Sequence, residues 1–123
     1  MAVITPERLE LPNSNAQGFN GVEVHQWRNF AVGDTFLPVQ SPKFTERSVI
    51  VEGAFSGSTV TMAGNNGYDT DTYFALNDRF GASLAFTVAG LRSVNEMTIN
   101  IKPVITLGTG SAMTVTLLIS RLP

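Results

Sequence analysis

Two long segments near the end of the chain alternate between apolar and polar residues. In residues 97–106 and 112–120, Met, Ile, Val and Leu recur at alternate positions, and Thr, Asn, Lys and Ser fill most of the positions between them. Successive side chains of a β-strand point to opposite faces, whereas a helix repeats its faces about every 3.6 residues. The pattern therefore predicts two strands, each with one buried face, and no segment shows the helical period over a comparable length.

Shorter alternating segments precede these two, and Gly, Asn, Ser and Pro separate them. Residues 22–30, 47–55 and 59–63 show the clearest alternation. The sequence Ser56-Gly57-Ser58 predicts a tight hairpin turn between the second and third of these segments. Residues 107–111 predict a second hairpin loop, which would join the two long strands.

The number and spacing of these segments define the expected fold. About seven to nine strands at roughly ten-residue spacing are typical of an antiparallel β-sandwich or barrel. The only helical turn is expected within residues 89–96. We therefore expect an all-β fold: a single antiparallel β-sandwich, jelly-roll-like, with an extended N-terminal arm. The predicted core consists of residues on the apolar faces of the strands: Val49, Val51, Val60, Met62, Ile99, Ile101, Val115 and Leu117.

The first part of the chain differs from the rest in composition. Prolines bracket residues 6–12, and residues 13–21 are mostly polar and rich in Gly and Asn, so neither stretch can bury one face. We therefore divide the chain into an extended arm, residues 1–21, and a sandwich domain, residues 22–123. The arm is either a loosely ordered terminus or a segment that orders on a partner. The predicted partner-binding residues are apolar residues of the arm and one loop tyrosine: Val3, Ile4, Leu9, Leu11, Phe19 and Tyr68.

Charge and composition exclude several classes of function. Eight Lys and Arg residues against ten Asp and Glu residues give a net charge of −2, which disfavours nucleic-acid binding by a basic surface. The chain has no Cys, so disulfide scaffolds, thiolate nucleophiles and cysteine zinc sites are excluded. The first residues do not match a signal peptide and no window is apolar enough to span a membrane, so we expect neither export nor a membrane partner.

The candidate catalytic and metal-binding residues do not form a recognisable site. His25 is the only histidine, and no G-x-S-x-G motif supplies a nucleophile for it. Asp69, Asp71 and Asp78 are the densest carboxylates, but the spacing of an EF-hand loop is absent, which favours a solvated acidic turn. Glu52 and Asp71 would act as a glycosidase pair only at a defined separation. We predict that the protein is not an enzyme and holds no cofactor or metal.

The order of the strands and turns resembles a known family. The stretches that carry the resemblance run from Trp27 to Thr35, Val49 to Phe55, Ser58 to Gly67, Leu76 to Gly81 and Ile101 to Gly108. They are similar to the W-x-n-l-x-x-G-D strand, the v-x-G-x-f / x-V-x-l-x-G-S-N-D-G hairpin, the L-x-D-x-x-G turn and the final r-P hairpin of one group of proteins. That group is the small β-sandwich capsid decoration (cement) proteins of tailed bacteriophages.

The resemblance implies a structural role. Proteins of this kind bind the outside of the major capsid protein shell, usually as small homo-oligomers, so the expected partners are the major capsid protein and further copies of the chain in a homodimer or homotrimer. It implies no enzyme activity, no cofactor, no nucleic-acid partner, and a location on the capsid surface of the virion after synthesis in the host cytoplasm. The alternative is a carbohydrate-binding or adhesion module of a phage particle, because β-sandwiches with Gly- and Asn-rich loops also serve as lectins.

Overall fold

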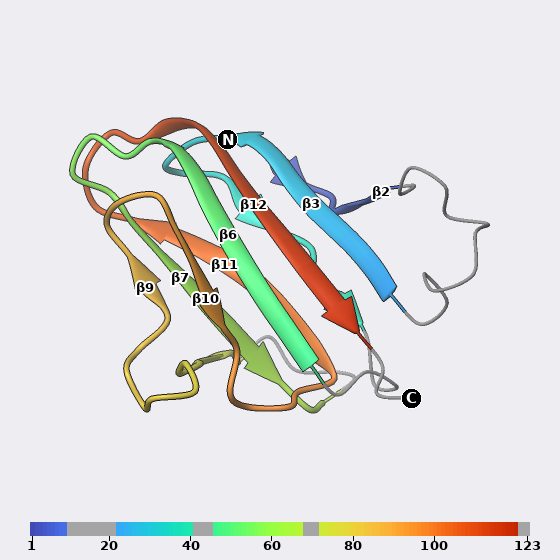
Figure 1. The fold of residues 1–123 in the computed structure, drawn as a ribbon. Helices are drawn as coiled ribbons and strands as arrows, with labels where there is room; N and C mark the ends of the chain where they lie inside the picture. Colours follow the sequence, from blue (N-terminus) through green and yellow to red (C-terminus); the bar gives the residue numbers. More distant parts are fainter. Residues whose placement is uncertain (10–21, 41–45, 68–71, 121–123) are drawn as a thin grey trace.

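The described part of the chain is built from strands. The computed structural model describes residues 1–9, 22–40, 46–67 and 72–120, and no helix occurs within these ranges. Two antiparallel sheets pack face to face around one hydrophobic core (Figure 1). The predicted all-β antiparallel sandwich is therefore confirmed. In the same ranges, no helix is long and apolar enough to cross a membrane.

Each sheet combines strands that are distant in the sequence. In the order of their hydrogen bonding, the strands of sheet I are β10 (Gly90–Ser93), β6 (Glu46–Ala54), β12 (Ser111–Ser120), β3 (Val22–Phe30) and β2 (Glu7–Leu9). Those of sheet II are β5 (Val39–Gln40), β11 (Asn100–Thr106), β7 (Thr59–Asn65) and β8 (Phe74–Ala75), with β9 (Ala85–Phe86) also paired to β7. A small parallel sheet pairs β1 (Val3–Ile4) with β4 (Thr35–Phe36).

The core lies between the inward faces of sheets I and II. Every predicted core residue except Ile99 is fully buried, with 0% of its surface exposed. Trp27 also lies in this core, and its indole Nε1 donates a hydrogen bond to the Leu37 carbonyl oxygen at 2.8 Å, which satisfies its one polar atom. The rings of Phe30 and Phe36 meet edge to face with 4.7 Å between their centres.

The strand predicted at residues 97–106 begins later than expected. Strand β11 starts at Asn100, because the residues before it make hydrogen bonds outside the ladder. The Ile99 N–H donates to Asn66 Oδ1 at 2.9 Å, and the Thr98 hydroxyl donates to the Asn100 carbonyl oxygen at 2.9 Å. Ile99 is only partly buried, so its prediction as a core residue is wrong.

Neither predicted hairpin joins neighbouring strands of one sheet. The turn at residues 56–58 leads from β6 in sheet I to β7 in sheet II, and residues 107–110 lead from β11 in sheet II to β12 in sheet I. These two crossover turns lie against each other: Ser58 Oγ donates to the Leu107 carbonyl oxygen at 2.7 Å and accepts from the Gly110 N–H at 2.8 Å. Both hairpin predictions are wrong, because a strand that ends at a sheet corner can continue into the opposite sheet.

The segment expected to hold a helical turn, residues 89–96, contains strand β10. It pairs antiparallel with β6, with Leu91 opposite Ile50 and Arg92 opposite Val49. Pairing at the sheet edge satisfies backbone groups that an isolated helical turn would leave without partners. The expected helical turn is therefore absent from this segment, and tertiary pairing overrides the local preference.

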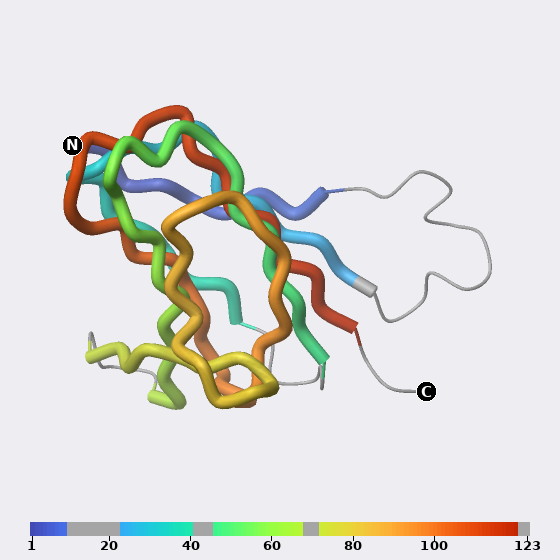
Figure 2. Tube along the Cα trace, turned by 60° about the vertical axis from the view of Figure 1, so that its left-hand side comes forward, coloured from blue at the N-terminus to red at the C-terminus, as the bar shows by residue number. Residues whose placement is uncertain are grey.

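Residues 1–9 are extended, as predicted, and they pair with the sandwich of their own chain. The Thr35 N–H donates to the Ala2 carbonyl oxygen at 2.9 Å, and β2 adds antiparallel to β3 at the edge of sheet I. In Figure 2 the first residues, in blue, lie beside β3, in light blue. The rest of the predicted arm, residues 10–21, lies outside the described residues.

Candidate functional site

The predicted partner-binding residues that the structure describes lie at one edge of the sandwich. Ile4 packs against the core, and Leu9 is partly buried in β2. Val3 is 63% exposed in β1, so it is the member of this group with a large free surface. The remaining members lie outside the described residues: Leu11, Phe19 and Tyr68.

The structure does not bring the candidate catalytic residues together. His25 contacts a glutamate two positions away on β3, with 2.9 Å between Nε2 and the carboxylate, and Asp78 belongs to a separate ion pair. Glu52 is exposed on β6, whereas its possible partner Asp71 lies outside the described residues, as does Asp69. Within the described ranges, no group of three or more metal-ligating side chains occurs.

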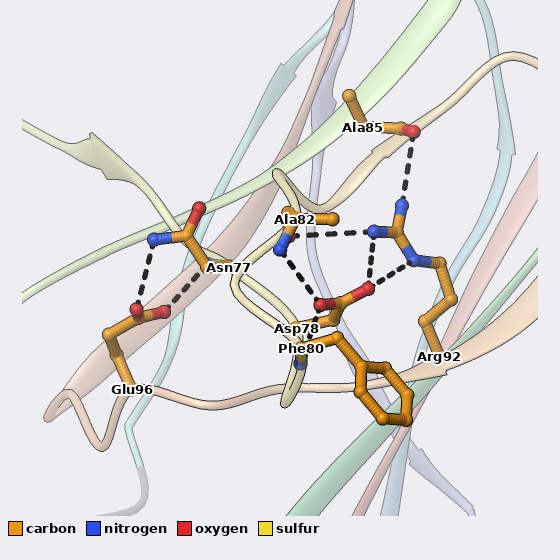
Figure 3. A network of polar contacts seen from close by, with 7 residues as sticks. All are labelled: Asn77, Asp78, Phe80, Ala82, Ala85, Arg92 and Glu96. Atoms are coloured by element: carbon orange, nitrogen blue, oxygen red, sulfur yellow. Dashed lines mark hydrogen bonds and ion pairs between the residues drawn. The ribbon is translucent and has the colours of Figure 1, made fainter.

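A polar network holds the turn at residues 77–82, as Figure 3 shows. Oδ1 of the Asp78 carboxylate accepts hydrogen bonds from the N–H groups of Phe80 at 2.9 Å and Ala82 at 3.0 Å. Oδ2 accepts from Arg92 Nη2 at 2.6 Å. The hydrogen bond from Arg92, together with those from the backbone, lowers the pKa of Asp78. The turn is thereby fixed to β10.

A second carboxylate fixes the start of the same turn (Figure 3). Glu96 accepts from the Asn77 backbone N–H at 2.6 Å and from Asn77 Nδ2 at 3.1 Å, and the backbone hydrogen bond is the main reason that the pKa of Glu96 is lowered. Arg92 also donates to the Ala85 carbonyl oxygen at 3.3 Å and lies over the Phe86 ring, 5.4 Å from its centre. The network therefore connects the turn with β10 and with the core.

The braced turn places an exposed aromatic ring beside apolar residues of sheet I. Phe80 is 86% exposed and Leu91 is 64% exposed, and both line a shallow depression of about 360 Å³. Leu91 lies opposite Ile50 on the neighbouring strand, and Leu118 lies on the same outer face of the sheet. We call these four residues the apolar patch: Ile50, Phe80, Leu91 and Leu118.

The rim of the apolar patch is polar. Ser48, Ser93 and Arg79 line both this depression and a neighbouring one, which Glu46 also lines. Exposed apolar side chains that lie together within a polar rim mark sites of protein contact. The apolar patch is therefore a candidate surface for contact with another protein.

The comparisons with known proteins provide no assignment for this chain. No protein-family model, no curated protein and no solved structure matches it.

Proposed function

We propose that this chain is a capsid decoration protein of a tailed bacteriophage, which binds the outer surface of the major capsid protein shell and stabilises the head. The observation that carries the proposal is the apolar patch, because its side chains are exposed while a sheet and a braced turn hold them in place. Burial of apolar surface contributes roughly 25 cal/mol per Å² to an interface. A preorganised patch loses little conformational entropy when a partner covers it.

Residues that carry the sequence resemblance have structural tasks that suit such a scaffold. Trp27 fills the core, and Asp78 closes the turn that bears part of the patch. Asp34 accepts hydrogen bonds from the N–H groups of Ala2 and Ala31, both at 2.9 Å, and these bonds lower its pKa. The motif residues thus support a rigid binding module.

We further propose that the sandwich is a jelly roll. The order β3-β12-β6-β10 in sheet I faces the order β5-β11-β7-β8 in sheet II, and the chain crosses between the sheets repeatedly, for example from β6 to β7 and from β11 to β12. This order corresponds to two Greek keys wrapped into a double sheet. Jelly rolls occur in both viral capsid and lectin domains, so the strand order suits the proposed function and does not by itself separate it from the carbohydrate-binding alternative.

No described feature favours the carbohydrate-binding alternative. Trp27 is buried in the core, and the exposed rings of Phe74 and Phe80 belong to different elements. The Tyr73 ring lies under the ammonium group of Lys102, which is 4.2 Å from the ring centre. A sugar platform would instead need aromatic faces that are exposed together.

Binding to empty heads tests the proposed function. Heads of the phage whose genome encodes the chain are mixed with the purified protein and sedimented, and the bound protein is measured. We expect saturable binding by the wild type and at least about a tenfold loss of affinity for the double variant Phe80→Ser/Leu91→Ser. The matched control is Leu107→Ser, because Leu107 is 71% exposed but lies in a crossover turn outside the patch.

The native mass of the same samples tests the proposed homodimer or homotrimer on the virion surface. A wild-type protein that fails to bind heads contradicts the proposed function. An equal loss of affinity in the patch variant and the Leu107 control contradicts the proposed contact surface.

A further inference from the structure

Arg47 lies inside the sandwich although it carries a charge. It is on the same face of β6 as Val49 and Val51, which point into the core, and only 4% of its surface is exposed. Burial lowers the pKa of the Arg47 guanidinium, but an arginine remains protonated at neutral pH. The end of the core near Arg47 therefore contains a positive charge.

The Arg47 guanidinium makes hydrogen bonds to neutral oxygens. Nη1 donates to the Thr98 hydroxyl at 3.2 Å, and Nη2 donates to the Thr98 carbonyl oxygen. The buried Nε has no hydrogen-bond partner. Among the described residues, no carboxylate forms an ion pair with Arg47.

Arg92, a second arginine of the same chain, has the carboxylate partner that Arg47 lacks among the described residues. Arg92 also points toward the core, but its guanidinium pairs with the Asp78 carboxylate at 2.6 Å. Transfer of a charge out of water costs free energy that is recovered only when a counter-charge and further hydrogen bonds are present. Arg47 is more deeply buried than Arg92 and has no such counter-charge in the described residues.

A small cavity is lined in part by Arg47. Its volume is about 90 Å³, and it is lined by Arg47, Asn66, Met97, Thr98 and Ile99. One water molecule occupies about 30 Å³ in the liquid, so the cavity has room for a carboxylate group. Met97 is 44% exposed and Asn66 is exposed, so the cavity opens to the surface. Asn66 uses Oδ1 to accept the Ile99 N–H, which leaves Nδ2 as a further donor.

We propose that this cavity is an oxyanion site that binds a carboxylate-sized group, with Arg47 as its counter-charge and Asn66 as a second donor. The planar guanidinium suits carboxylate and phosphate oxygens, because it presents several N–H donors in a fixed geometry. The anion is either a free ion in solution or an acidic side chain of a partner protein. This inference does not depend on the proposed function.

Thermal unfolding of the full chain tests the site. At constant ionic strength, replacement of chloride by acetate, sulfate or phosphate should raise the melting temperature of the wild type by about 3–5 °C at saturation. Arg47→Met should abolish this rise and leave the melting temperature in chloride unchanged or higher, because an uncompensated buried charge is removed. The matched control Arg79→Met removes an exposed arginine and should keep the rise.

A comparison of ligands distinguishes the two sources of the anion. The probe is a blocked tripeptide with a central glutamate, and its control is the glutamine analogue. If the glutamate peptide binds at least about tenfold more tightly than acetate and the glutamine peptide does not bind, the site is assigned to an acidic side chain of a partner protein. Equal affinities for the peptide and acetate assign it to a free anion. The proposal is overturned if no anion raises the melting temperature of the wild type, or if Arg47→Met shows the same rise.

A second measurement needs no variant and covers the case in which Arg47→Met does not fold. The arginine Nε–H signals of the wild type are followed by nuclear magnetic resonance during the anion titration. A saturable shift of the signal of the buried Arg47 Nε supports the site. An unchanged Arg47 signal at the highest anion concentration excludes it.

Discussion

Gly108 lies where the two crossover turns touch, and it can do so because it has no side chain. A Cβ atom at Gly108 would lie 2.5 Å from backbone atoms of Ser56, Gly57 and Ser58. Because these atoms belong to the backbone of the facing turn, no change of rotamer can relieve the overlap. Gly108 also has a φ angle of +57°, which disfavours residues with a Cβ atom. Gly108→Ala therefore adds both backbone strain and steric overlap.

Gly81→Ala separates these two effects. Gly81 has a φ angle of +84°, but no heavy atom lies within 4 Å of its Cβ position, so the variant reports backbone strain alone. We expect it to lower the free energy of unfolding by about 1 kcal/mol, because the strain exceeds the entropy lost by the unfolded chain. In Gly108→Ala the facing turn must also move, and overpacking of this kind costs about 1–3 kcal/mol more. The expected total is about 2–4 kcal/mol.

Urea unfolding measures both variants in one assay. Trp27 is the only tryptophan and is fully buried, so its fluorescence reports loss of the core. The midpoint of Gly108→Ala should fall well below that of Gly81→Ala, with the slope unchanged. If the two variants lose the same free energy within about 0.5 kcal/mol, the contact between the crossover turns does not constrain position 108 and the reasoning is refuted.

Other changes test the core, the carboxylates and the N-terminal strands. Ile101→Ala should lower the free energy of unfolding by about 2–5 kcal/mol because Ile101 is fully buried, and Ile99→Ala should cost clearly less in the same urea titration. The pKa values of Asp78 and Glu96 are lowered in the folded state, so their stabilisation is complete above the unfolded pKa of about 4 and is lost as the pH falls through the folded pKa. Acid titrations should show this loss, and Asp78→Asn should flatten it. Asp34→Ala should speed hydrogen exchange of the β4 amides while the core amides keep their protection, because Asp34 anchors the chain next to β1.

Alternation in the sequence is sufficient to predict the long strands and most of the core, but it misses β10, which lies where a helical turn is expected. Val115 and Leu117 are buried as expected, because the apolar face of a strand must pack against the opposite sheet. The prediction failed at Ile99, whose backbone bonds to the distant side chain of Asn66. Periodicity is a local signal and contains no information about such a partner.

The pairing of strands and the candidate surface could not be predicted from local patterns. The residues of the turn at 56–58 suit a hairpin as well as a crossover, and the choice depends on β11 and β12, which come much later in the chain. Phe80 and Leu91 come together because Asp78 pairs with Arg92, a contact between a turn and a strand edge. The sequence signals for the patch are single apolar residues on the outer faces of two strands, Ile50 on β6 and Leu118 on β12.

Strand β12 follows all the other described strands in sequence, yet it lies in the middle of sheet I between β6 and β3. On the ribosome, β3 and β6 are therefore made long before the strand that joins them. Until β12 emerges, their backbone edges are open to pairing with other nascent chains. Closure over such long sequence separations is slow, and all-β sandwiches fold in about milliseconds to seconds. The sandwich consequently assembles only after β12 has left the ribosome, and its yield in the cell should fall as the rate of expression increases.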